Sequence, residues 1–211
     1  MTESSTSSNS QRRRAALLDA AEKLIVREGY DSVKLRDIAL EAEVSIGLLQ
    51  HYFRTRDDLM REAMSVASSR RISRWTRSAE GAQSDWERLS TLLARAVDDT
   101  YRSSVWLELC AASTHHPELR DDVEAVQQTW RQALLTAIKS GVNSGEFAPI
   151  VSPDKLTDIL VNLIDGKLLE IATLSRRPST AEWTDTTLHL ARHLLGAASQ
   201  KIGRASCRER V

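Results

Sequence analysis

The sequence predicts an all-α fold, in which an N-terminal three-helix helix-turn-helix domain is followed by a larger C-terminal helical domain. Apolar residues recur at intervals of three and four along most of the chain, which is the period of a helix with one buried face. The 211 residues include 8 glycines and 4 prolines, and runs of β-branched residues are short, so a sheet protein is disfavoured. Serine or threonine precedes several apolar runs, where it can cap a helix.

The first expected helix spans residues 12–28. Before it, residues 1–10 (MTESSTSSNS) are polar and serine-rich, and we expect them to be disordered. Gly29 ends the helix, because glycine readily adopts the left-handed conformation that follows a helix C-terminus. The apolar stripe of this helix consists of Ala16, Leu17, Ala20, Ala21, Leu24 and Ile25.

Residues 38–59 (IALEAEVSIGLLQHYFRTRDDL) carry the most informative pattern in the chain. A short apolar period is broken at Val44, and the Ser45 hydroxyl can then cap a second short helix over residues 46–51. Thr55, followed by acidic residues, starts a third helix. Two short helices joined by a tight turn can place one of them in the major groove of DNA. The segment therefore indicates a DNA-binding helix-turn-helix.

The remaining helices are located by capping residues, prolines and glycines. Ser84 begins a capping box, Pro117 and Pro153 suit the first turn of a helix, and Ser179 caps the last one. The expected helices span about residues 57–79, 85–97, 105–114, 117–145, 153–174 and 180–199, with a junction at 80–82.

Four segments follow from this pattern. We expect a disordered N-terminus (1–10), a helix-turn-helix DNA-binding domain (11–56), a helical regulatory and dimerisation domain (57–199) and a basic tail (200–211). The tail loses the helical period, and the sequence leaves open whether it is native or derived from an expression vector.

The charge distribution agrees with DNA binding by one local surface. The net charge is zero, but residues 1–80 hold 14 Lys or Arg against 12 Asp or Glu, and residues 81–200 hold 11 against 16. The positive excess thus lies on the domain expected to meet phosphates. A neutral protein does not coat nucleic acid generally, so binding must depend on a local patch.

Several other classes are disfavoured. No apolar run is long enough for a membrane span, and no secretion leader is recognisable; two cysteines without a pairing pattern suit the reducing cytoplasm. The chain lacks HExxH, Cys-x-x-Cys, G-x-G-x-x-G, phosphate-loop and G-x-S-x-G motifs, so we expect no cofactor, no metal site and no catalysis. Two alternatives stay open: an interaction protein whose helix-turn-helix fold does not bind DNA and, less favoured, a small helical enzyme.

Residues 12–60 resemble the DNA-binding domain of the TetR family of bacterial transcriptional repressors. The resemblance is carried by AALLDAAEKLIVREGY, the IA…A.VS core, the HYF triplet and TRDDL, and SIGLLQHYF is most similar to the BetI-type branch. Three residues depart from the pattern. Glu43 replaces a turn glycine, Gln50 replaces a common tyrosine, and Lys34 stands where a capping threonine is frequent. Glu43 must therefore tolerate a turn geometry that glycine adopts more easily.

Recognition-helix geometry gives the expected DNA contacts. The N-terminal part of such a helix faces base edges, and the following helix start faces phosphates. Gln50 is the best base reader, because its amide offers a donor and an acceptor together, as adenine requires. Tyr52 is interpreted either as a phosphate contact or as a core aromatic, and Phe53 as core. The expected DNA-contacting residues are Lys34, Arg36, Ser45, Ile46, Gly47, Leu48, Gln50, His51, Tyr52, Thr55 and Arg56. Residues 12–14 (Arg-Arg-Arg) are either a solvated terminus or a DNA-contacting arm.

The second half resembles the BetI-type regulatory domain through VWLELCAASTHHPELR and LVNLIDGKLLE, although Lys167 stands where an apolar residue is usual. Such a helical domain would hold a small-molecule effector in a mostly apolar pocket. The expected lining residues are Trp106, Leu109, Cys110, Trp130, Leu134, Asp165 and Leu169, with helix-core packing as the competing interpretation. His115 and His116 are expected to be exposed in a loop.

The charge of the effector stays open at this stage. Five tryptophans with Glu108 and Asp165 nearby would suit a cation. If Lys167 and Arg131 neutralise those acids, a neutral hydrophobic molecule is favoured instead, and this is the alternative that we prefer from the sequence.

The last two long helices carry wide apolar faces, which predicts a homodimer. The faces consist of Leu156, Ile159, Leu160, Leu163, Leu188, Ala191, Leu194 and Leu195. Pairing them across a two-fold axis would form a four-helix arrangement, as the family resemblance also implies. The complete expectation is a homodimeric repressor on double-stranded operator DNA, released when an effector shifts the spacing of its recognition helices.

Overall fold

The computed structural model describes residues 3–174 and 179–197, and within these ranges all regular structure is helical, which confirms the all-α fold. The elements are α1 (Glu3–Glu28), α2 (Leu35–Glu41), α3 (Ile46–Tyr52), α4 (Arg56–Arg77), α5 (Asp85–Arg95), α6 (Thr100–His115), the 3-10 turn η1 (Pro117–Leu119), α7 (Arg120–Asn143), α8 (Pro153–Thr173) and α9 (Thr180–Leu194). None of the helices in these ranges is both long and apolar enough to cross a membrane.

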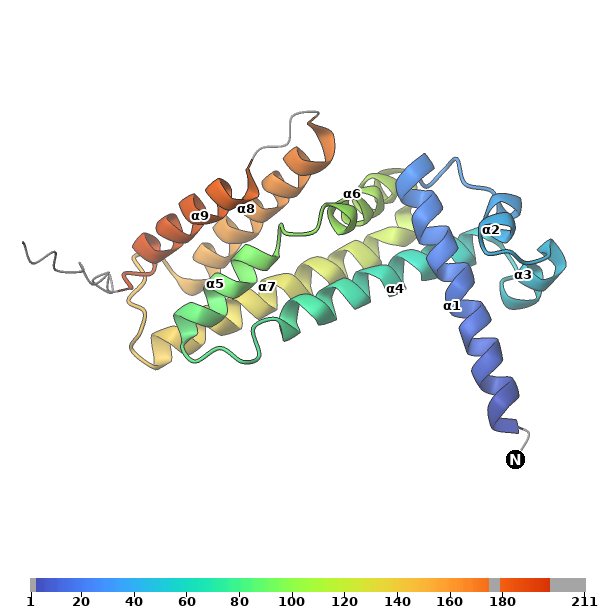
Figure 1. Cartoon of the computed structure of the whole chain (residues 1–211). Coiled ribbons are helices and arrows are strands. Elements are labelled where there is room, and N and C mark those ends of the chain that lie inside the picture. The colour runs from blue at the N-terminus through green and yellow to red at the C-terminus, as the bar shows by residue number, and fades with distance from the viewer. Residues whose placement is uncertain (1–2, 175–178, 198–211) are drawn as a thin grey trace, which may run out of the picture.

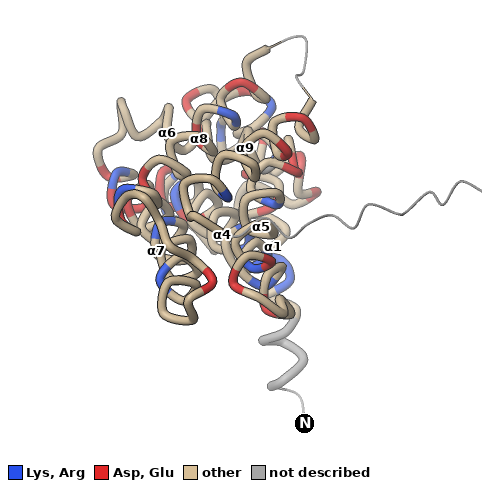
Figure 2. The backbone as a smooth tube through the Cα atoms, turned by 90° about the vertical axis from the view of Figure 1, so that its left-hand side faces the viewer, with Lys and Arg blue, Asp and Glu red and all other residues tan. Residues whose placement is uncertain are grey.

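The molecule is elongated, with α1–α3 at one end and α5, α8 and α9 towards the other, while α6 reaches α1 (Figure 1). Helix α4 begins beside α3 and continues into the larger group of helices, where it packs against α6 and α7 as well as α1. A view along the larger domain shows α4, α5, α7, α8 and α9 grouped around a common interior (Figure 2). One continuous hydrophobic core extends from Leu17 in α1 to Leu195 after α9.

Helix starts agree with the sequence prediction wherever a side chain caps the first turn. Hydroxyl oxygens of Ser45, Thr55, Ser84, Ser152 and Ser179 accept the backbone N–H three residues later, at 3.2, 3.0, 3.0, 3.4 and 3.2 Å. Lys34 precedes α2 without a side-chain cap of its own. The Asp37 side chain provides the capping contact instead, because Asp37 Oδ2 accepts the Lys34 backbone N–H at 3.2 Å.

Four predicted boundaries were wrong, one of them the start of α6, which begins at Thr100 and not near residue 105. Helix α1 begins at Glu3, so residues 3–10 are not disordered as expected; no glycine or proline interrupts them, and each residue added to a formed helix gains a hydrogen bond. The predicted helix from Pro117 starts as the turn η1 before α7. Helix α9 ends at Leu194, because Gly196 follows at φ +59°, and the predicted tail, residues 200–211, lies outside the described residues.

The turn between α2 and α3 has the expected strained position. Glu43 adopts φ +54°, in the left-handed region that a residue with a Cβ enters at a cost of roughly 1–2 kcal/mol. Its N–H donates to Leu40 O at 3.1 Å, and the Val44 N–H donates to Ala39 O at 2.9 Å. These bonds close the turn and set the direction of α3, with Leu49 buried beneath it.

Arg56 has a structural role that the sequence analysis did not assign to it. Its Nε donates to Val33 O at 2.7 Å, its Nη2 donates to Tyr30 O, and its guanidinium lies 5.3 Å from the centre of the Tyr30 ring. The side chain thus points inward and fixes the loop between α1 and α2 to the start of α4. The prediction of Arg56 as a phosphate contact is corrected accordingly, because its guanidinium bonds to carbonyl groups of its own domain. A long side chain at a helix start can extend either towards the protein or towards DNA, and the sequence does not distinguish the two.

Replacing Arg56 with alanine should therefore destabilise the fold. Arg56→Ala removes charge-assisted hydrogen bonds to two loop carbonyls, and we expect the free energy of unfolding to fall by about 2–3 kcal/mol. Urea denaturation followed by circular dichroism measures this change. Arg54→Ala is the matched control, since Arg54 is exposed, and it should change stability by less than about 0.5 kcal/mol. Equal stability of the two variants would contradict the assigned role.

Candidate DNA-binding surface and effector cavity

The outer face of α2 and α3 presents most of the residues expected to contact DNA. Eight of them are exposed: Lys34, Arg36, Ser45, Ile46, Gly47, Gln50, His51 and Thr55. Leu48, Tyr52 and Arg56 are half-buried. The Tyr52 ring packs against the core and lies edge-on to His51, and Phe53 is buried as expected. The structure therefore brings the predicted set onto one surface, with Arg56 turned inward.

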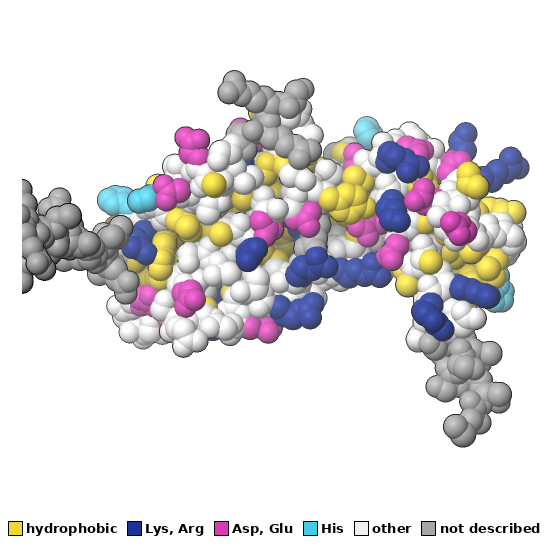
Figure 3. Space-filling view, viewed as in Figure 1, with side chains coloured by type: hydrophobic (Ala, Val, Ile, Leu, Met, Phe, Trp, Pro, Cys, Tyr) yellow, Lys and Arg dark blue, Asp and Glu magenta, His cyan; other side chains and the backbone are white. Residues whose placement is uncertain are grey.

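Unpaired positive charge surrounds this face. Within the described ranges, Lys34, Arg36 and Arg54 are exposed and form no ion pair. Of the nearby acids, Glu41 lies close to Lys23 and Arg27, at 4.0 and 3.6 Å. Figure 3 shows Lys and Arg side chains spread over the end of the molecule formed by α1–α3. The sequence analysis did not include Arg54 among the DNA-contacting residues. Its position between the HYF triplet and the capping residue Thr55, both of which were included in part, could have indicated it.

Gly47 leaves α3 open to a close approach from outside. A Cβ built at Gly47 would have no atom within 4 Å, and its φ is not in the left-handed region. Neither packing nor backbone geometry within the protein therefore calls for glycine, although glycine in a helix costs about 1 kcal/mol relative to alanine. Leu40, 80% exposed at the end of α2, is a further surface residue to which the sequence analysis gave no role.

The three N-terminal arginines divide between two roles. Arg14 pairs with Glu62 of α4 and stacks over the Phe53 ring, with its guanidinium 4.8 Å from the ring centre. It therefore joins α1 to α4 and is not part of a DNA arm. Arg12 and Arg13 are exposed, so for them both interpretations made from the sequence stay open.

His116 connects the end of α6 to the first domain. Its Nε2 lies 2.6 Å from Asp31 Oδ1, and its ring centre lies 4.9 Å from that of Tyr30. The hydrogen bond to Asp31 raises the pKa of His116, and the same bond lowers the pKa of Asp31. The prediction that His116 is simply exposed was wrong, because the folding of α1 against α6 places Asp31 beside it.

A cluster of aromatic and charged side chains lies between α4, α6 and α7. The ring centre of Trp130 lies 6.0 Å from that of Trp75 and 5.3 Å from that of Trp106, and the Arg71 guanidinium lies 4.5 Å above the Trp130 ring. Trp75 Nε1 donates to Leu92 O at 2.8 Å. Burial lowers the pKa of Arg71 to about 10, although Asp99 and Asp165 oppose this shift.

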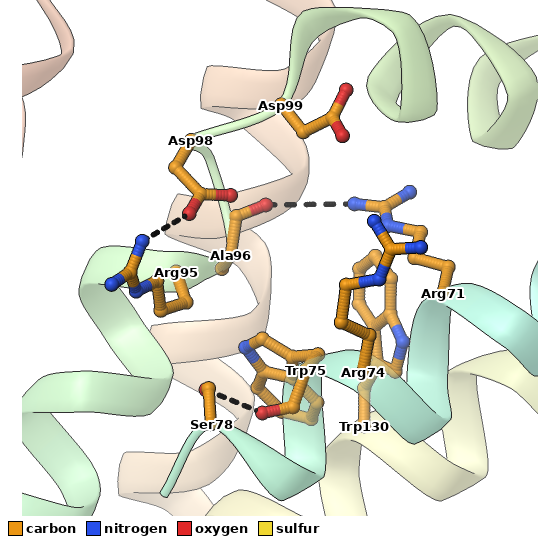
Figure 4. Close-up of a pocket in the computed structure, with 9 residues that line it drawn as sticks. All are labelled: Arg71, Arg74, Trp75, Ser78, Arg95, Ala96, Asp98, Asp99 and Trp130. Carbon is orange, nitrogen blue, oxygen red and sulfur yellow. Dashed lines mark hydrogen bonds and ion pairs between the residues drawn. The ribbon is translucent and has the colours of Figure 1, made fainter.

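Two cavities adjoin this cluster. One, of about 270 Å³, is lined by Arg71, Arg74, Trp75, Ser78, Arg95, Ala96, Asp98, Asp99 and Trp130 (Figure 4). The other, of about 320 Å³, is lined by Glu22, Ala67, Ser68, Arg70, Arg71, Arg74, Asp99, Tyr101, Val105, Trp106 and Val126. Because Arg71, Arg74 and Asp99 line both, the two cavities are neighbours that share a charged wall.

The predicted lining residues separate into four groups, the last of which is Cys110 with Asp165. Trp130 lines the first cavity and Trp106 lines the second, and their contact with a ligand stays a prediction. Leu109 and Leu134 are fully buried in the core and line neither cavity. Leu169 is 52% exposed on the outer side of α8, so its prediction as a pocket residue was wrong. The helical period shows that a helix has an apolar face, but it does not show what that face packs against.

Cys110 and Asp165 lie beside the cluster rather than in the lining of either cavity. Burial raises the pKa of the Cys110 thiol to about 12, and burial also raises the pKa of Asp165. The proposed neutralisation of Asp165 by Lys167 and Arg131 was wrong. Lys167 is buried and pairs with Glu170 at 2.9 Å, whereas Arg131 pairs with Asp154 and Asp158. The cation that acts on Asp165 is Arg71.

Comparison with known proteins agrees with both halves of the chain. The sequence profile of the TetR family of bacterial regulatory proteins matches residues 17–63, and that of the BetI-type transcriptional repressor C-terminal domain matches residues 86–196. The transcriptional regulator BetI of Cronobacter sakazakii is 31% identical over 199 residues, which cover 88% of this chain and 93% of that protein.

Solved structures share the fold over nearly the whole length. A transcriptional regulator from Saccharomonospora viridis in complex with choline superimposes with a TM-score of 0.78 at 26% identity, over 87% of this chain and 96% of that one. A TetR-family regulator from Rhodococcus sp. gives a TM-score of 0.74 at 26% identity, over 88% and 99%. The enzyme alternative is thereby set aside. This chain belongs to the TetR family of bacterial transcriptional regulators, and its C-terminal part is a BetI-type repressor domain.

Proposed function

We propose that this protein is a cytoplasmic homodimeric repressor that reads a near-palindromic operator with α3 and is released by a small organic effector bound beside Trp130. The observation that carries the DNA-binding part is the exposed face of α2 and α3. It combines unpaired cations, the exposed amide of Gln50 and a glycine that nothing in the protein requires. Phosphates would meet the cations, and base edges would meet the start and middle of α3.

The proposed dimer uses a stripe on α8 that differs from the one expected from the sequence. Leu160 and Leu195 are fully buried within the protomer, so they cannot meet a second subunit. The exposed positions follow a spacing of four and three along α8 and include Ile159, Asn162, Gly166 and Leu169, with Leu190 exposed on α9. A Cβ at Gly166 would contact nothing within 4 Å, which leaves room for a partner helix to approach closely.

The effector part of the proposal rests on the position of the cavities. They are lined by α4, which starts next to α3, and one of them reaches α1 at Glu22. A ligand that favours one arrangement of α4 and α6 would therefore change the placement of α3 through packed helices and through the contact of His116 with Asp31. The choline found in the Saccharomonospora viridis relative supports a small organic effector in a domain of this kind.

Gln50→Ala tests operator reading. If the Gln50 amide pairs with a base, its loss should weaken binding to the preferred operator by about 1–3 kcal/mol and relax the preference at that base pair. Fluorescence anisotropy against a set of operator variants, starting from the DNA upstream of the gene, measures both effects. Gln127→Ala, an exposed glutamine on α7, is the control and should bind as wild type.

Two results would count against this proposal. If Gln50→Ala keeps the wild-type ranking of all operator variants, Gln50 does not read a base. If the wild-type protein shifts no DNA at all, the alternative of an interaction protein without DNA binding is favoured.

Charge placed on the α8 stripe tests the dimer. Leu169→Arg combined with Ile159→Arg should give a monomer, because two unpaired charges would be buried at the interface, while helicity is retained since both side chains are exposed in the protomer. Light scattering gives the mass, and circular dichroism gives the helicity. Ile150→Arg, at a position 65% exposed before α8, should remain dimeric. A wild-type monomer at micromolar concentration would refute this assembly.

A further inference from the structure

One histidine lies between two carboxylates where the end of α6 meets the loop between α1 and α2. His116 Nε2 lies 2.6 Å from Oδ1 of Asp31 in that loop, and His116 Nδ1 lies 3.4 Å from Oε1 of Glu118 in η1. A neutral imidazole carries one N–H and can donate to only one of these carboxylates, whereas an imidazolium carries an N–H on both nitrogens. This geometry favours the protonated ring.

The backbone on the side of the larger domain fixes the position of the ring. The His116 N–H donates to Ala112 O at 2.8 Å, and the His116 carbonyl accepts the Leu119 N–H at 3.0 Å. Because Pro117 follows, His116 leaves the helical region, with φ −116° and ψ 86°. Leu119 is fully buried and anchors η1. A well-fixed segment therefore holds the imidazole beside Asp31.

The other side of the contact leads directly into α2. Helix α6 packs against α1 here (Figure 1), and the His116 ring centre lies 4.9 Å from that of the buried Tyr30. The Tyr30 carbonyl accepts a hydrogen bond from Arg56 at the start of α4. Three residues after Asp31 the chain reaches the exposed Lys34 and then α2. His116 thus connects the end of α6 to the segment that positions α2.

The acids outweigh the other influences on the charge of His116. The hydrogen bond to Asp31 raises the pKa of His116, and Glu118 adds to this shift against the opposing effect of burial. Burial raises the pKa of Tyr30 to about 12, so this phenol stays neutral near pH 7. The charged and titratable groups on the elements that meet here are Tyr30, Asp31, Arg56, Asp57, His115, Glu118 and Arg120.

From this arrangement we propose that His116 forms a pH-dependent contact that holds the α1–α2 loop, and with it the start of α2, to the end of α6. The protonated ring bonds to Asp31 and Glu118 together, and the neutral ring can donate to only one of them. The pKa of His116 is raised in the folded protein, so the stabilisation is complete below 6.5, the ordinary value. It is lost as the pH rises through the raised pKa.

The contact restricts how α2 and α3 are oriented relative to the larger domain. A dimer whose two α3 helices are held at one spacing loses less conformational freedom when it binds both half-sites of an operator. This step alone rests on the proposed function. Operator binding is therefore expected to gain more from His116 at low pH than at high pH.

A titration of the full chain by nuclear magnetic resonance tests the charge of the ring. The chain has 5 histidines, and His116→Gln identifies the signal of His116. His116 should titrate above 6.5, and Asp31→Asn should move its pKa back towards that value. His189, which lies 3.5 Å from Asp185 within α9, is the control and should titrate alike in wild type and Asp31→Asn. A wild-type value at or below 6.5, or no change in Asp31→Asn, overturns the proposal.

Amide hydrogen exchange tests whether the contact holds the loop. Exchange of residues 29–34 is compared between His116→Gln and wild type at the same pH, so that the intrinsic pH dependence of exchange cancels. Since a partly exposed ion pair stabilises weakly, the variant should exchange about two- to fivefold faster at about pH 6 and nearly equally at about pH 8.5. His189→Gln should leave the loop unchanged at both values. A ratio for His116→Gln that does not depend on pH overturns the proposal.

Fluorescence anisotropy with operator DNA tests the regulatory consequence. The affinity of wild type relative to His116→Gln should be about two- to fivefold higher at about pH 6 than at about pH 8.5. His51, exposed on the DNA-facing surface, is present in both proteins, so its titration cancels in the ratio. A ratio that stays constant or changes in the opposite direction overturns the effect of this contact on DNA binding. Absence of binding to any DNA at both pH values contradicts the proposed function instead, and the titration and the exchange still decide the contact.

Discussion

The constraint on which the whole structure depends is the continuity of α4 (Arg56–Arg77). Its first residue holds the loop between α1 and α2, and its last turns carry Arg74 and Trp75 at the cavity. Arg56 and Trp75 lie about 28 Å apart along one helix, at 1.5 Å of rise per residue. The two ends cannot move independently unless the helix bends or unwinds, since a helix transmits displacement as a rigid element. In the proposed function, DNA reading and effector sensing would therefore be coupled through this one helix.

The burial of Arg71 is costly, and its surroundings explain how it is tolerated. The guanidinium is a weakly hydrated, flat cation, and it rests on the face of Trp130 with acidic groups nearby. Lysine at this place would lose the stacking contact and would carry a more strongly hydrated charge. A charged group held in this way adds little to the stability of the fold, because an apolar residue of similar size would avoid the desolvation cost.

The fold and the helix-turn-helix motif were predictable because their signals are local. Caps such as Ser45 and Thr55 act within one turn, and the short period of α2 and α3 identifies the motif without distant information. The orientation of long or apolar side chains was not predictable. Whether Arg56 meets a loop or a phosphate, and whether Leu160 or Leu169 faces the core, depends on partners far along the chain. The cavity wall combines residues of α4 with Asp99 before α6, which no spacing in the sequence reveals.

The elongated shape gives the exposed stripe of α8 a geometric significance. Alternating steps of four and three residues favour helices that cross at a shallow angle, so two protomers joined there would lie nearly parallel along this helix. The stripe lies towards the end of the molecule opposite α3 (Figure 1). Each protomer would then rotate about its contact at the α8 stripe. A rotation too small to disturb the packing at that contact would move α3, which lies at the opposite end, through a larger distance. In the proposed dimer, a small ligand-induced rotation would therefore change the spacing of the two α3 helices enough to alter their fit to the operator.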